Sequence, residues 1–66
     1  MRLTDLWTRL QETFGPGYAD SVARDQVLAP LNGRTIQQAL AAGVDPTVVW
    51  RAVVLAYPDR VPNRLR

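Results

Sequence analysis

Apolar side chains in the first part of the chain recur at spacings of three and four residues. On an α-helix this spacing places them on one stripe. They are Leu3, Leu6, Trp7, Leu10 and Phe14. We expect a helix from Asp5 to Phe14 with Thr4 as its N-cap, because a threonine hydroxyl accepts a hydrogen bond from a free backbone N–H of the first turn. Gly15–Gly17 should end this helix, since glycine suits a C-cap and proline breaks the hydrogen-bond ladder.

A second amphipathic stretch follows this turn. Asp20 or Ser21 can cap its start. The helix is expected to include the apolar residues Val22, Ala23, Val27 and Leu28. Pro30 disfavours helix at the residue before it, so this helix should fray or bend there. Asn32 and Gly33 predict a turn after it.

Two further helices have clear local start signals. Thr35 and Gln38 form the capping-box pattern, in which each side chain satisfies a backbone donor of the other residue. The helix that they begin should end at Gly43. Asp45–Pro46 is typical of an N-cap followed by a first helical position. Pro58 should end this fourth helix.

Together these patterns predict an all-α fold. We expect a compact single domain of four short helices over residues 1–57, and an extended, partly disordered C-terminal tail over residues 58–66 that is rich in proline and arginine. The expected core combines the inward positions of all four helices. These positions are Leu3, Leu6, Trp7, Leu10, Phe14, Val22, Val27, Leu28, Ile36, Ala39, Leu40, Val44, Val49 and Val53.

The third and fourth helices resemble a helix-turn-helix pair. The run Ala39–Val53 is similar to the bacterial repressor pattern, with alanine four residues before the turn glycine and an inward valine six residues after it. The outward positions of the recognition helix would be Asp45, Pro46, Thr47, Trp50, Arg51 and Val54. Only Thr47 and Arg51 suit base readout, and Asp45 would repel phosphate. Gln38 also stands where the pattern has an inward apolar residue.

All eight basic residues are arginine, and they are unevenly distributed. Residues 1–33 carry a net charge of −1 and residues 34–66 carry +3, within an overall charge of +2. Phosphate contacts from the arginines of the second half would support weak, non-specific nucleic-acid binding. The alternative is that these arginines only solvate the tail. They are Arg34, Arg51, Arg60, Arg64 and Arg66.

Trp7 and Trp50 both lie on apolar stripes, so core positions are the first interpretation of each. Trp50 lies about 100° around its helix from the inward line of Val49 and Val53, close to Val54. A second apolar face needs either another helix or a partner to cover it.

We therefore expect a protein-interaction module that uses the outer face of the fourth helix and the arginine tail. Its partner would be an unknown protein or a second copy of the chain. The alternative is a DNA-associated helix-turn-helix protein. The candidate partner or DNA contacts are Arg34, Thr47, Trp50, Arg51, Val54, Arg60, Arg64 and Arg66.

The composition argues against catalysis. The chain has no cysteine, histidine or lysine, so it lacks a thiol nucleophile, an imidazole base and a Schiff-base amine. We expect no enzyme activity, no catalytic residue, no cofactor and no bound metal. No apolar run approaches the roughly 20 residues of a membrane span, and the N-terminus lacks a signal-peptide pattern. A cytoplasmic location without membrane association is the expectation.

Short motifs over nearly the whole chain carry a family resemblance. They are Met1–Thr4, Phe14–Gly15, Tyr18–Asp20, Ala23–Asp25, Val27–Leu28, Gly33–Thr35, Ala39–Val44, Pro46 and Val49–Val53. With these motifs the chain resembles an uncharacterised family, domain of unknown function 3046. It departs from that pattern at Gln26, Asn32 and Val54, where histidine, glycine and cysteine are expected.

The resemblance implies a compact helical domain and an actinobacterial source. It also implies genes near the recombinase RecA and its regulator RecX, and hence a link to recombination or DNA repair. It implies no activity and no catalytic residues.

Overall fold

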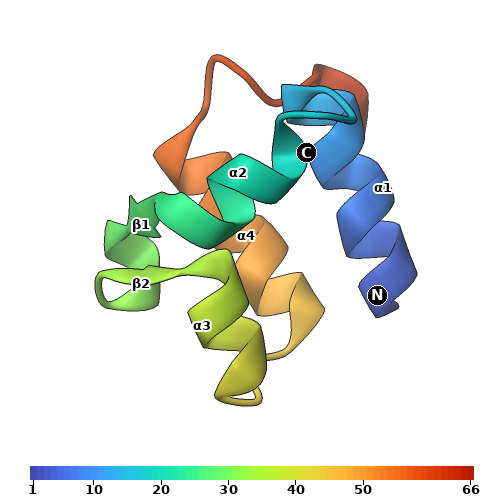
Figure 1. Ribbon diagram of the computed structural model, residues 1–66. Helices are drawn as coiled ribbons and strands as arrows, with labels where there is room; N and C mark the ends of the chain where they lie inside the picture. Colours follow the sequence, from blue (N-terminus) through green and yellow to red (C-terminus); the bar gives the residue numbers. More distant parts are fainter.

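Helix α1 (Leu3–Phe14) forms one side of the computed structural model, which describes residues 1–66 (Figure 1). The helix begins two residues earlier than the sequence predicts. Its N-cap is Arg2, whose backbone N–H donates to Asp5 Oδ2 at 3.1 Å. The expected Thr4 cap is therefore wrong, because the carboxylate three residues after Arg2 serves the start of the helix instead. At the other end Gly15 has a φ of 96° and closes the helix as expected.

Helix α2 (Ala19–Asp25) begins before the predicted caps Asp20 and Ser21, which are therefore wrong: its N-cap is Tyr18, without a side-chain cap, and the helix also ends earlier than expected. The next residues form a short hairpin instead of continuing the helix. Strand β1 (Val27–Leu28) pairs antiparallel with strand β2 (Arg34–Thr35). The 3₁₀ helix η1 (Ala29–Leu31) lies between them.

This two-stranded sheet corrects the all-α expectation, although the chain is mainly helical. Its physical cause lies in local turn chemistry. Gln26 and Leu28 have an extended backbone, with ψ of 122° and 124°, so the chain leaves α2 before it reaches Pro30 in η1. Asn32 and Gly33 then adopt positive φ values of 60° and 74° and reverse its direction. Asparagine and glycine are the residues that tolerate this conformation most easily.

Helix α3 (Ile36–Ala41) has the capping box that the sequence predicts. The Gln38 backbone N–H donates to Thr35 Oγ1 at 3.0 Å, and the Thr35 N–H donates to Gln38 Oε1 at 2.9 Å. The end of the helix is also confirmed. Gly43 has a φ of 87°, and the Val44 N–H donates to the Ala39 carbonyl at 3.0 Å, which is the Schellman arrangement.

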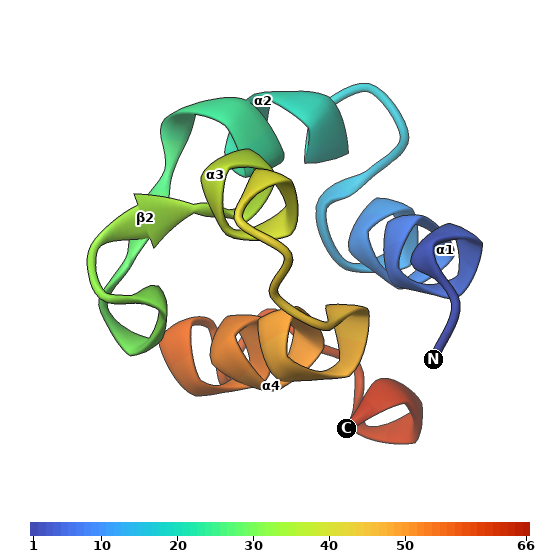
Figure 2. The same cartoon turned by 90° about the horizontal axis from the view of Figure 1, so that it is seen from below.

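Helix α4 (Pro46–Ala56) begins at the predicted Asp45–Pro46 pair. The Thr47 backbone N–H donates to Asp45 Oδ1 at 2.8 Å. The helix ends two residues before Pro58, as expected. In Figure 2, α2, α3 and α4 follow one another from top to bottom, and α1 lies beside them. No helix exceeds 12 residues, and none combines the length and apolarity needed to cross a bilayer.

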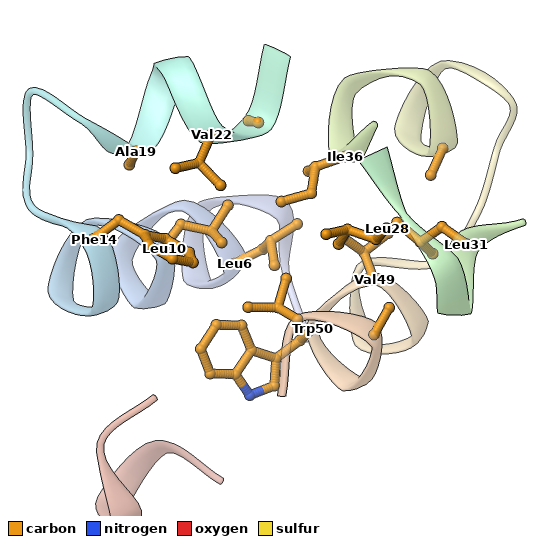
Figure 3. Close-up of a cluster of buried hydrophobic side chains, with 14 of the residues drawn as sticks. Leu6, Leu10, Phe14, Ala19, Val22, Leu28, Leu31, Ile36, Val49 and Trp50 are labelled. Carbon is orange, nitrogen blue, oxygen red and sulfur yellow. The ribbon is translucent and has the colours of Figure 1, made fainter. Parts of the chain in front are cut away.

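The core lies where α1, α2, α3 and α4 meet the hairpin (Figure 3). Most expected core residues are buried there, and Trp7, Leu40 and Val44 are half-buried against it. The expectation is wrong for Leu3, which is 50 % exposed, and for Val27, which is 63 % exposed. The first turn of α1 stands clear of the other elements in Figure 1. Val27 points outward because successive residues of a strand face opposite sides.

Several buried residues were absent from the expected core. They are Ala19, Ala23, Leu31, Trp50, Ala52 and Val61. The alanines mark close approaches between helices, which a small side chain permits but does not signal in sequence. The burial of Trp50 and Val61 depends on the C-terminal segment.

Asp45 makes a pH-dependent contribution to stability. The hydrogen bond from the Thr47 backbone N–H, followed by one from the Thr47 side chain, lowers the pKa of the Asp45 carboxyl below its usual value. A lowered pKa in the folded state stabilises the fold fully above the unfolded pKa of about 3.9, and this contribution is lost as the pH falls through the folded value.

We therefore expect the Asp45→Asn variant to lose less stability than the native chain between about pH 5 and pH 2. Asparagine still caps the helix but does not titrate. Urea unfolding of both proteins at both pH values measures how much stability each one loses. The other carboxylates titrate in both proteins, so their contribution cancels when the two losses are compared. Equal losses in the two proteins would contradict the role given to Asp45.

Candidate interaction surface on helix α4

The C-terminal segment folds back onto the domain instead of extending from it. Val61 is only 4 % exposed, and the 3₁₀ helix η2 (Asn63–Leu65) follows it. Figure 2 shows this last turn beside α4, on the side nearer to α1. The expectation of an extended tail is therefore wrong. Val61 and Leu65 of the tail pack against the core, and the composition of the tail does not indicate that such a surface is available to them.

This segment covers Trp50. The indole is 4 % exposed, and its Nε1–H donates to the Leu65 carbonyl at 2.9 Å. The Arg9 guanidinium lies 5.6 Å from the ring centroid, within the range of a cation–π interaction. In Figure 3 the ring nitrogen points away from the labelled aliphatic cluster. The first interpretation of Trp50 as a core residue is confirmed, and the expectation that it faces outward is wrong, because α1 and the tail cover this side of α4.

Intramolecular contacts engage the tail arginines. Arg60 lies 5.3 Å from the centroid of Phe14, and Arg64 Nη1 lies 3.2 Å from Glu12 Oε2. Arg66 donates to the Pro58 carbonyl. The Arg64 ion pair is exposed, so it contributes at most about 1 kcal/mol. These contacts hold the tail on α1 and α4, and the charges therefore have a role beyond solvation.

The outer face of α4 carries apolar side chains that no other element covers. Leu55 is 71 % exposed and Val48 is 48 % exposed, and these two residues are seven apart on the helix. Arg51 lies between them and is exposed, while Val54 is half-buried. This stripe is opposite to the inward Val49–Val53 line, as the 3.6-residue period requires.

A hollow of about 300 Å³ opens on this face. Three apolar and two basic residues line it. They are Trp50, Val54, Leu55, Arg51 and Arg66. Four of these five are among the contact residues that the sequence suggests, and the fold brings Arg66 to α4 from the end of the chain. Leu55 was missed, although its position opposite the inward stripe is a usable signal.

The other suggested contact residues do not line this hollow. Arg34 lies on β2, Thr47 lies in the first turn of α4, and Arg60 and Arg64 face α1. The suggested residues therefore do not form one continuous surface.

Two arginine side chains and no acidic side chain border the hollow, and the surface inside it is apolar. The two ion pairs of the structure join Arg24 to Asp25 and Arg64 to Glu12, so neither Arg51 nor Arg66 pairs with a carboxylate. The hollow is thus an apolar depression with a positive rim. Elsewhere in the molecule the carboxylates stay dispersed, and no three of them come together to hold a metal ion.

Removal of the Val61 side chain tests how the tail is held. We expect Val61→Ala to lower the free energy of unfolding by about 1–3 kcal/mol, because two buried methyl groups are lost and a cavity remains. It should also speed solvent exchange of the Trp50 indole N–H, measured by NMR. Leu55→Ala is the control, since that exposed side chain supports nothing in the fold. Unchanged exchange in Val61→Ala would show that the tail does not depend on this anchor.

No curated protein and no solved structure matches this chain. The family described as protein of unknown function (DUF3046) matches residues 1–64, which is nearly the whole sequence. The chain therefore belongs to the DUF3046 family.

Proposed function

We propose that this domain is a non-catalytic protein-interaction module that binds its partner through the outer face of α4. The observation that carries the proposal is the uncovered apolar side chain of Leu55, which lines a hollow on this helix together with the half-buried Val54. Exposed apolar residues gathered around a hollow are typical of interaction sites. The absence of histidine, cysteine and lysine supports the non-catalytic part.

Isolated exposed apolar residues occur on every protein, and the α4 face differs from them in its surroundings. Val27 has a similar exposure to Leu55, but it lies on a two-residue strand and lines no hollow. Leu55 borders a hollow next to an aromatic ring and two arginines. Arginine is among the residues enriched in the energetic centres of protein interfaces.

A DNA-associated helix-turn-helix remains the second candidate function. The short, glycine-capped turn between α3 and α4 favours it. Three features weigh against it. Asp45 places a negative charge at the start of the helix that would enter the groove, the tail covers Trp50, and Arg60 and Arg64 already have contacts within the chain.

Photo-crosslinking from position 55 tests the interaction module. We expect a crosslinker at Leu55 to capture a partner in cells, and we expect one at Val27 to capture none. The purified partner should then bind the native chain and the Val27→Ser variant equally. It should bind Leu55→Ser at least about fivefold more weakly, since interface centres cost more than about 1 kcal/mol when truncated. Equal binding of both variants would refute the role of α4.

Titration with a short mixed-sequence DNA duplex tests the second candidate. Amide shifts of the labelled chain are followed at low salt and near physiological salt. A helix-turn-helix reader would show salt-sensitive shifts at residues 43–51 and at Arg34, because phosphate contacts depend on salt. We expect no such cluster. Its appearance would replace the interaction module with the DNA-associated function.

A further inference from the structure

We propose that the hollow on α4 binds an acidic peptide segment of a partner, which places one large aliphatic side chain on the apolar floor and carboxylates at Arg51 and Arg66. This inference rests on the proposed function, because it names the kind of partner that the same surface accepts. It is carried by the joint presence of an apolar floor and two arginines without carboxylate partners.

The floor of the hollow selects for an apolar group. Val54, Leu55 and Trp50 are its apolar lining residues. A hollow of about 300 Å³ is at the lower limit of small-ligand sites, which span about 300–1,000 Å³. It is open to one side and large enough for one bulky side chain of a bound segment. Nothing in the floor offers a hydrogen bond to a base edge, so a nucleic acid would leave it unused.

The rim selects for carboxylates. Each guanidinium has five N–H donors in a planar fork that matches a carboxylate. Arg51 donates to no group of the chain, and Arg66 donates only to the Pro58 carbonyl. Both retain donors toward the solvent. By contrast, Arg64 is held by Glu12 and Arg60 lies over Phe14. Arg2 and Arg34 also lack an acidic or aromatic partner, but among the arginines of α4 and the tail the two without one are those that border the hollow.

The two arginines come from different parts of the chain. Arg51 is in the middle of α4, while Arg66 reaches the hollow only because Val61 and Leu65 hold the tail against the domain. A segment bound between them would contact both α4 and the tail. The occupant is therefore expected to bind the folded tail as well as the helix.

The experiment is an NMR titration of the labelled full chain with a short peptide of leucine and glutamate. Two matched peptides serve as controls. One has glutamine in place of every glutamate, and the other has serine in place of every leucine. The reporters are the Trp50 indole N–H and the amides of Arg51, Val54 and Leu55. The Trp7 indole N–H is the internal control, because it does not line the hollow.

We expect the leucine–glutamate peptide to shift the Trp50 indole and the α4 amides, more strongly at low salt. The Arg51→Gln variant should bind it roughly two- to fivefold more weakly, which is the range of an exposed ion pair. Arg24→Gln removes the same charge from α2, away from the hollow, so this variant should bind the peptide like the native chain. The serine peptide should not shift these signals.

Several results would overturn the inference. Equal binding of the glutamine peptide would remove the acidic requirement, and equal binding of the serine peptide would remove the apolar one. Shifts of the same α4 signals by duplex DNA or anionic vesicles would assign the surface to another class of ligand. Concentration-dependent shifts without peptide would assign it to a second copy of the chain. If crosslinking at position 55 yields a partner while no acidic peptide binds, the interaction module stands and this inference fails.

Discussion

Helix α4 has apolar side chains on two adjoining faces, and both must be covered for so short a chain to fold stably. The inward line of Val49 and Val53 meets the other helices and the hairpin. Trp50 lies to the side, where Arg9 of α1 and Leu65 of the C-terminal segment contact it. A domain of this length buries only about 60% of the surface that its unfolded chain exposes. The last residues therefore act as part of the core, and the Trp50–Leu65 hydrogen bond satisfies the one polar atom of the buried indole.

The same arrangement distributes the positive charge of the second half of the chain. Arg60 and Arg64 lie against Phe14 and Glu12 of α1, so they help to hold the tail. Arg51 and Arg66 are left at the hollow on α4. The tail thus covers the side of α4 that would otherwise expose Trp50. It also contributes Arg66 to the border of the hollow on α4. Packing and the candidate interaction surface depend on the same segment.

The arrangement of the tail bears on the proposed helix-turn-helix function. The turn between α3 and α4 has the local geometry of such a motif, but the side of α4 that carries Trp50 is already occupied within the chain. What stays open is the apolar stripe of Val48 and Leu55, with the half-buried Val54 beside it. A partially apolar stripe with arginines at its border suits a protein surface better than the uniformly charged phosphate backbone of DNA.

The sequence by itself determined the features that depend on neighbours a few residues apart. The capping box of Thr35 and Gln38, the Asp45 cap and the Gly43 end of α3 all arise from contacts within one helical turn, so their patterns were sufficient. The tertiary structure decided the pairing of the hairpin, the burial of Trp50 and Val61, and the meeting of Arg51 with Arg66. Each of these joins residues that are distant along the chain or lie in a segment whose composition predicts disorder. Whether an apolar side chain is core or surface depends on which distant element reaches it, and a local pattern does not contain that information.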